Sequence, residues 1–273
     1  MTQQYTKTNL SINGQFVLAD TANLSQDAIQ RAILSLNTSN PYDYTPSSLK
    51  STLSINYVIE TQSDPNYTIV SNWKSNTTSS PTAVINLGDV IVTGYLSSYS
   101  LNLNPQRRVE AKASYEIYTP LTGNFTSQNS TDYLLYNTTN GSGVANYFSA
   151  YFYIDDTQAT DTTIVSFSYD FSFALAPIYT LGSPFPSQIM ALNALEKIET
   201  VSETQINSNF SGNHFNSFFN QVNNLRISNI ASTWGGFSNQ ITFPLSGMVI
   251  QANKVDISVN DIILFNSSFN MSY

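Results

Sequence analysis

From Val165 to Leu175 the chain reads Val-Ser-Phe-Ser-Tyr-Asp-Phe-Ser-Phe-Ala-Leu, and from Val109 to Ile117 it reads Val-Glu-Ala-Lys-Ala-Ser-Tyr-Glu-Ile. In both stretches the odd positions are apolar or small, and the even positions are polar or small. A period of two places one set of side chains on each face of a β-strand. Both stretches are therefore predicted to be half-buried strands with one face toward water, which favours an all-β fold.

Other segments extend this strand pattern along most of the chain. The apolar run 84–103 contains Gly88 and Gly94, which divide it into two strands or bend it with a bulge. Many short strands joined by long polar loops predict a β-sandwich, and a jelly roll is the leading topology. The further predicted strands lie at 53–59, 67–73, 147–154, 241–245, 248–252, 255–259 and 262–265.

Three segments carry the spacing of a helix instead. Residues 25–36 begin with Ser25 as a candidate N-cap, and their apolar residues fall on one stripe. Residues 188–201 and 214–225 also place their apolar side chains three and four positions apart. Each of these segments is predicted to be a short helix.

The order of these elements indicates one domain. Strands flank the segment 185–236 on both sides, so we interpret it as a helical insertion in a single sandwich domain over residues 25–273. Residues 1–24 contain few apolar side chains and are predicted to be an extended N-terminal arm. Such an arm is expected to add an edge strand to a neighbouring subunit.

The composition excludes several classes of protein. Charged residues make up only 10% of the 273 residues, against about 25% in ordinary soluble domains, and uncharged polar residues and Tyr replace them. The net charge of −8 and the scattered cations exclude direct binding of a nucleic-acid backbone, since only Arg107 and Arg108 are adjacent. The absence of Cys excludes disulfides and thiolate metal sites.

The sequence also lacks the usual targeting segments. The first residues, Met-Thr-Gln-Gln-Tyr-Thr-Lys, have no apolar core, so no signal peptide is expected. No apolar run approaches about 18 residues, so no transmembrane segment is expected.

The residues that could carry chemistry form few patterns. His214 is the only histidine, so a histidine metal cluster is excluded, and we interpret it as a surface or capping residue. Asp155, Asp156 and Asp161 are the only acidic loop cluster and a calcium candidate, although their spacing does not match an EF-hand. Solvated carboxylates in a loop that connects strands explain them better.

Two further sets of residues have a pattern that could carry function. Glu110 and Glu116 share one face of a predicted strand, but their separation is long for a glycosidase pair, and a cross-strand charge ladder with Lys112 explains them better. Glycan acceptor sequences, Asn-X-Ser/Thr, recur along the chain. Those predicted to lie in exposed loops begin at Asn124, Asn129, Asn137 and Asn140. No catalytic residue and no cofactor are expected.

The whole chain, strand-dense, free of Cys and rich in Asn, Ser, Thr and Tyr, resembles coat, penton or turret proteins of archaeal viruses. The resemblance lies in composition and transfers no site residue. It implies a non-enzymatic structural protein made in the host cytoplasm, located in the virion and bound to its own copies and to other virion proteins.

Two alternatives stay open. The 17 Tyr and 16 Phe residues could provide stacking platforms for sugars in a receptor- or carbohydrate-binding fibre or adhesin that recognises host-surface glycans. Amphipathic strands such as 163–175 are also typical of β-pore-forming proteins.

Overall fold

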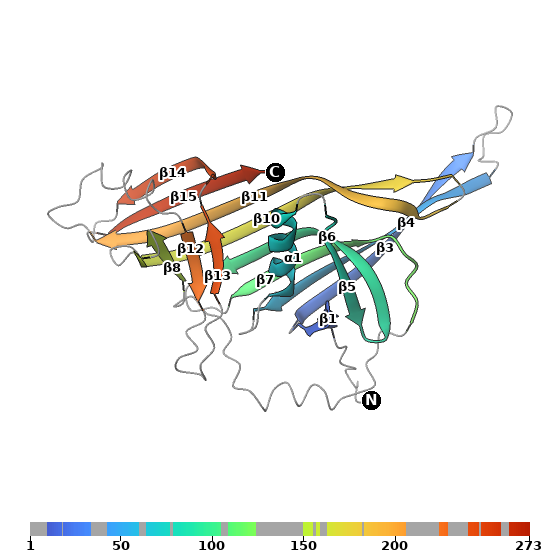
Figure 1. Cartoon of the computed structure of the whole chain (residues 1–273), viewed down its shortest axis with the longest axis horizontal. Coiled ribbons are helices and arrows are strands. Elements are labelled where there is room, and N and C mark those ends of the chain that lie inside the picture. Colours follow the sequence, from blue (N-terminus) through green and yellow to red (C-terminus); the bar gives the residue numbers. More distant parts are fainter. Residues whose placement is uncertain are drawn as a thin grey trace, which may run out of the picture.

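The structure is a computed structural model. Its fold is built almost entirely from antiparallel strands. It describes residues 10–17, 19–33, 43–59, 64–76, 79–104, 109–123, 150–154, 157–158, 163–181, 183–205, 224–228, 240–245, 247–257 and 262–273. Within these residues a single helix accompanies the strands (Figure 1). The all-β class expected from the sequence is confirmed.

The strands are numbered in chain order and form two sheets. Their bounds are β1 Leu10–Ile12, β2 Gln15–Phe16, β3 Ala19–Ile33, β4 Asp43–Val58, β5 Thr82–Leu87, β6 Val90–Leu103, β7 Glu110–Ile117, β8 Ala150–Ile154, β9 Thr157–Gln158, β10 Thr163–Tyr179, β11 Pro186–Gln205, β12 Asn224–Ser228, β13 Gln240–Pro244, β14 Val249–Ile257 and β15 Ile262–Ser272. The helix, α1, spans Pro65–Ser75.

The larger sheet forks at β6. One edge of β6 pairs with β7, which leads on to β4 and β3. The opposite edge is shared, because β5 pairs with Val90–Tyr95 and β10 pairs with Ser98–Leu103. From β10 the sheet continues through β11 and β15 to β14, and from β5 it continues to β1 and β2. The smaller sheet has the order β13-β12-β8-β9.

A close approach at Gly94 accompanies this fork. Gly94 is buried, and a Cβ atom at this position would lie 2.7 Å from Ile85 Cδ1 and 3.1 Å from Tyr115 Cδ1. No other residue fits this space without displacing its neighbours, so glycine lets β5, β6 and β7 pack tightly here.

The core lies on one face of the large sheet, under α1. Trp73 of α1 packs edge-on against Phe171 and Phe173 of β10, with ring centroids 6.0 and 5.0 Å away. From the smaller sheet, the buried Phe243 lies 4.6 Å from the ring of Tyr169. Figure 1 shows α1 crossing in front of the strands, so the helix and the smaller sheet cover different parts of the same face.

The inward faces predicted for the stretch 109–117 and for the centre of the stretch 165–175 are confirmed. The inward side of β10 buries Phe167, Tyr169, Phe171 and Phe173, whereas Asp170 is exposed. The run 84–103 is divided by a turn at Gly88, where φ is +64°, into β5 and β6. The two strands expected at 248–252 and 255–259 form one continuous strand, β14.

Two helices expected from the sequence are wrong. Residues 25–36 were expected to be helical, but β3 extends through Ile33 and pairs with β4, for instance Leu24 with Leu53. Cross-strand hydrogen bonding here outweighs a weak local preference for helix. The helix expected at 188–201, the first part of the helical insertion expected over 185–236, is also wrong, because Pro186–Gln205 is the long strand β11.

A bulge explains the misleading spacing in β11. Ile189 and Ile198 are both buried although nine residues apart, which strict alternation would place on opposite faces. The register against β10 shifts between Ala174 and Leu175, and the extra residue on β11 restores the inward phase. Leu192 and Leu195, which complete the apparent helical stripe, are exposed.

The one helix in the described part of the chain lies where a strand was expected. Residues 67–73 were predicted to be a strand, but they belong to α1, which buries Ile69, Val70 and Trp73 on one side. These positions have the i, i+1, i+4 spacing of a helix face. The helix expected at 214–225 lies mostly outside the described residues, and Asn224 and Leu225 begin β12.

The described part of the N-terminal segment joins the chain's own core. Leu10 and Ile12 of β1 are buried and pair with Leu87 and Ile85 of β5. This differs from the extended arm expected over residues 1–24. Residues 1–9 lie outside the described residues.

Two hairpins extend past their neighbouring strands. β7 pairs with β4 only over Ser51–Val58, so residues 27–33 and 43–50 form a two-stranded extension, the β3–β4 ribbon. Likewise β6 pairs only with Phe167–Ser172 and β15 only with Leu195–Gln205, so residues 173–179 and 186–194 form the β10–β11 ribbon. Both extend toward the right of Figure 1.

Candidate functional site

Two buried carboxylates mark the two ends of α1. Asp64 is the N-cap residue, and its carboxylate accepts a hydrogen bond of 2.9 Å from the backbone N–H of Asn66. Pro65 at the first helical position has no N–H to satisfy, so the Asp-Pro pair sets the start of the helix. At the other end, Lys74 in the last turn reaches Glu196 of β11.

Hydroxyl groups surround the first carboxylate. Tyr57 Oη donates to the two carboxylate oxygens of Asp64 at 2.8 and 2.9 Å, and Tyr99 Oη donates to Oδ2 at 2.7 Å. Asn66 Nδ2 donates to Tyr57 Oη at 2.7 Å, and Tyr115 Oη donates to Asn66 Oδ1. We call these five residues the Asp64 cluster; all of them are buried.

Burial controls the titration of this cluster. Loss of water raises the pKa of Asp64, and the hydrogen bonds from Tyr99 and Tyr57 oppose that shift. Burial and the nearby Asp64 carboxylate together raise the pKa values of Tyr57, Tyr99 and Tyr115 well above the usual range. The tyrosines therefore stay protonated and act as donors.

The second carboxylate is held by an ammonium group and two hydroxyls. Lys74 Nζ lies 2.7 and 2.8 Å from the oxygens of Glu196, Tyr169 Oη donates to Oε1 at 2.9 Å, and Tyr273 Oη donates to Oε2 at 2.6 Å. Glu196 is 1% exposed. This Glu196 cluster joins α1 to β10, β11 and the residue that follows β15.

The two clusters are anchors for α1. A general acid or base needs its proton within reach of a substrate atom. Asp64 and Glu196 are 4% and 1% exposed, and protein donors already occupy their oxygens. Their arrangement stabilises the contact of the helix with the sheet. Among the described residues no group of three or more His, Asp or Glu side chains is placed to bind a metal ion.

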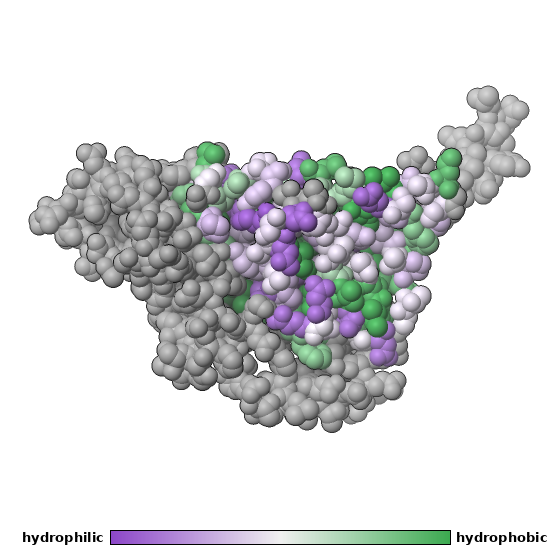
Figure 2. Space-filling view, viewed as in Figure 1, coloured by the Kyte–Doolittle hydropathy of each residue, from purple (hydrophilic) through white to green (hydrophobic). Residues whose placement is uncertain are grey.

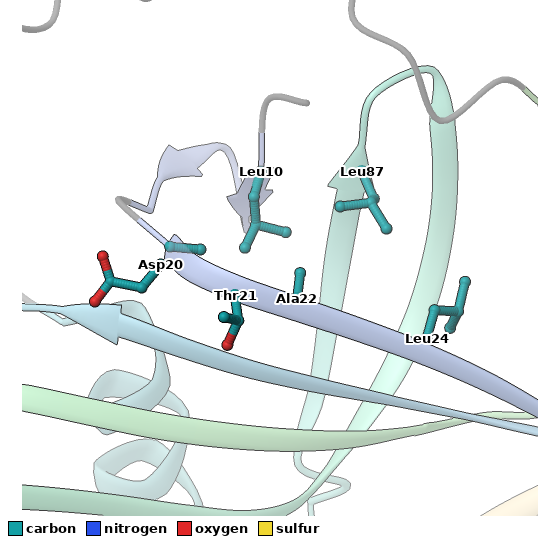
Figure 3. Close-up of a pocket in the computed structure, with 7 residues that line it drawn as sticks. Leu10, Asp20, Thr21, Ala22, Leu24 and Leu87 are labelled. Carbon is teal, nitrogen blue, oxygen red and sulfur yellow. The ribbon is translucent and has the colours of Figure 1, made fainter. Parts of the chain in front are cut away.

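An open groove lies beside the edge strand β3 (Figure 3). It has a volume of about 500 Å³. Ala22 and Leu24 of β3 face Leu10 of β1 and Leu87 of β5 across it, and Asp20 lies at one end. Ala22 and Leu24 pair with Ile55 and Leu53, which are buried, so the groove is an uncovered part of the core-facing side of the sheet.

The strand that borders this groove has an open edge. β3 pairs with β4 on one side, and no described strand pairs with its other side. It is 15 residues long and contains no proline. Natural proteins usually protect a long edge strand with proline, a short length or a covering segment. The open edge of β3 and the groove form the candidate functional site.

The predicted carboxylate pair has a structural explanation. Glu110 is exposed and Glu116 half-buried on the same face of β7, as the alternation predicts. Glu116 forms an ion pair of 2.6 Å with Lys50 of β4, and it accepts a hydrogen bond from Tyr118. The cross-strand partner is therefore Lys50, in place of the Lys112 expected from the sequence.

The other predicted site residues lie outside the described residues. They are His214, the calcium candidates Asp155, Asp156 and Asp161, and the glycan candidates Asn124, Asn129, Asn137 and Asn140. The roles assigned to them stay predictions. One further acceptor sequence begins at Asn66, which is completely buried in the Asp64 cluster and closed to a glycan.

Among the described residues, no helix has the length and apolar character needed to cross a membrane. A scan against models of known protein families found no match, and a search of curated proteins found no similar sequence.

Proposed function

We propose that this chain is a non-enzymatic structural protein of a virus particle, which forms a shell or vertex through contacts between its own copies. The open edge of β3, next to an apolar groove, carries the proposal. The low content of charged residues supports it, since uncharged polar side chains cost less to bury between subunits than unpaired charges.

The proposed contact is the addition of a strand. An extended segment of a second copy lies along β3 and hydrogen-bonds with its open edge. Alternate side chains of that segment point to one face, where the groove between Leu24 and Leu87 receives an apolar side chain. Asp20 at the end of the groove favours a neighbouring cation.

Residues 1–9 are the proposed donor segment. In Met-Thr-Gln-Gln-Tyr-Thr-Lys-Thr-Asn, Tyr5 and Lys7 are two positions apart and would share one face of a strand. The Tyr5 ring can therefore enter the groove while the Lys7 ammonium group lies near Asp20, because Asp20 and the groove residue Ala22 are also two positions apart. Because β1 belongs to the chain's own core, the donor segment must end before Leu10.

A jelly-roll-like sandwich is the topology that we propose for this subunit. The packing of Phe243 from the smaller sheet on Phe167 and Tyr169 of the larger sheet, with ring centroids 5.1 and 4.6 Å away, supports two facing layers. Non-enzymatic function is supported by the full occupation of the Asp64 and Glu196 oxygens by protein donors.

The test compares neighbouring residues on opposite faces of β3. Ala22 and Asn23 are both exposed, but only Ala22 lines the groove. Ala22→Arg fills the groove and is expected to abolish assembly, whereas Asn23→Arg leaves it intact. Deletion of residues 2–9 should match Ala22→Arg. Sedimentation velocity and negative-stain microscopy measure the assemblies, and circular dichroism confirms folding.

Two results would overturn the proposal. One is a full-length chain that stays monomeric at every concentration tested, and the other is an Ala22→Arg variant that assembles normally. A small oligomer that binds glycans without forming regular assemblies would instead identify the fibre or adhesin alternative.

A further inference from the structure

The end of the β10–β11 ribbon is uncharged and apolar. No Asp, Glu, Lys or Arg occurs between Asp170 and Glu196. Near the turn, Ile178 and Tyr179 are each 42% exposed, and Leu181 is fully exposed. In Figure 2 hydrophobic residues are most frequent toward the right of the described surface, the side to which this ribbon extends.

Serine hydroxyls near this turn form hydrogen bonds with part of its backbone. Ser187 Oγ donates to the carbonyl of Ile178 at 3.1 Å, and Ser183 Oγ donates to the carbonyl of Phe185 at 3.0 Å. In return, the N–H of Phe185 donates to Ser183 Oγ at 3.1 Å. Pro184 and Pro186 have no N–H to satisfy. These contacts and the two prolines reduce the number of backbone groups that need a hydrogen bond from water.

The edges of this ribbon are closed to strand addition, in contrast to β3. Pro177 continues the pairing with Ile189, so its nitrogen, which carries no hydrogen, must face away from β11. On the other strand, the register shift opposite Ala174 and Leu175 interrupts the β11 edge. The exposed side chains of the turn, and not its backbone edges, are available for contact.

We propose that this turn, residues 178–181 and 183–185, binds the interfacial region of a lipid bilayer. Ile178 and Leu181 enter the boundary between headgroups and acyl chains, and the Tyr179 ring lies at the headgroup level with its hydroxyl toward water. The backbone groups that are already paired within the turn lower the cost of entering this region, because no water has to be removed from them.

The charge distribution defines the kind of membrane. The turn has no Lys or Arg to attract anionic lipids, and the chain carries a net charge of −8. An anionic bilayer therefore repels the protein. Binding is strongest on neutral phosphatidylcholine, weakens as phosphatidylserine is added, and changes little with salt on neutral vesicles.

The first experiment uses the absence of Cys from the chain. Leu181→Cys provides a single site for an environment-sensitive fluorophore. With phosphatidylcholine vesicles the emission shifts to the blue, and lipids brominated on the acyl chains quench it. Ile91→Cys is the matched control, because Ile91 is 66% exposed on β6, away from the ribbon. Its fluorophore should show neither effect.

The second experiment measures partition by vesicle flotation. Leu181→Asp should lower the bound fraction by on the order of tenfold, and Ile91→Asp should leave it unchanged. Ala22→Arg, which disrupts the proposed assembly contact, should still bind vesicles, so the two proposals fail separately.

Three outcomes would overturn the inference. They are a wild-type chain that does not bind neutral vesicles, a Leu181→Asp variant that binds as well as wild type, and equal spectral shifts at positions 91 and 181. A change of oligomeric state in Leu181→Asp without wild-type vesicle binding would assign the turn to a second copy of the chain.

Discussion

The ammonium nitrogen of Lys74 lies 2.7 and 2.8 Å from the two carboxylate oxygens of Glu196, which is 122 residues later in the chain. The Lys74 side chain is 19% exposed and that of Glu196 is 1% exposed. A buried pair of this kind contributes little over a well-packed apolar pair, but its disruption leaves an isolated charge in the core.

Replacement of one partner should therefore be costly. Lys74→Met is expected to lower the free energy of unfolding by about 3 kcal/mol, because the Glu196 carboxylate loses its cation and keeps only hydroxyl donors. Lys197→Met is the control, since the Lys197–Glu199 pair is exposed, and should cost less than about 0.5 kcal/mol. Urea denaturation of both variants measures the difference. Equal losses would show that the Glu196 cluster does not anchor α1.

The Asp64 cluster should make stability depend on pH. Since burial raises the pKa of Asp64 in the folded protein, its stabilising contribution is present below the unfolded pKa and is lost as the pH rises through the folded pKa. From about pH 7 down to about pH 4, the wild type should gain stability relative to Asp64→Asn, which cannot titrate. Denaturation curves at several pH values test this. An opposite slope would mean that the hydroxyl donors outweigh burial and lower the pKa.

The buried tyrosines predict a cooperative alkaline transition. The pKa values of Tyr57, Tyr99, Tyr115 and Tyr169 are raised well above the usual range, with burial as the first cause. Their contribution to stability is complete below the unfolded pKa of about 10 and is lost as the pH rises further.

Tyrosinate absorbance and circular dichroism, recorded together, measure this transition. A fraction of the 17 tyrosines should titrate only as the secondary structure is lost, whereas all of them titrate at their ordinary pKa in denaturant. Complete titration of a chain that keeps its native circular dichroism would contradict the closed packing of the Asp64 cluster.

The sequence predicted most where alternation was strict. β7 and β10 were identified with the correct faces, because β7 pairs with β4 without a register shift and β10 pairs with β11 without one from Phe167 to Ala174, the part that buries its aromatic residues. In β11 the bulge broke the alternation and left apolar residues at helical spacing. For α1 a helix signal was present in the Asp64-Pro65 start, but the spacing of Tyr67, Ile69 and Trp73 suggested a strand.

The anchors of α1 had no local signature. Asp64 and Glu196 are single acidic residues far apart in the sequence. Each carboxylate accepts hydrogen bonds from tyrosines that only the folded chain brings close to it. The groove likewise combines β1, β3 and β5, so it depends on topology. The one indication that Glu196 is buried was its position between Ala194 and Ile198, which are both buried. This indication can be used only after Pro186–Gln205 has been assigned as a strand.

The phase of β10 supports a final prediction on stability. Phe171 is 1% exposed and contacts Trp73, whereas Ser168 is half-buried on the other side of the strand. Phe171→Ala should lower the free energy of unfolding by about 3–5 kcal/mol through lost burial and the cavity left beneath α1, and Ser168→Ala should change it little. Thermal and urea denaturation measure both. Comparable losses in the two variants would show that the ring of Phe171 does not pack under α1, and would remove the basis for the assigned faces of the large sheet.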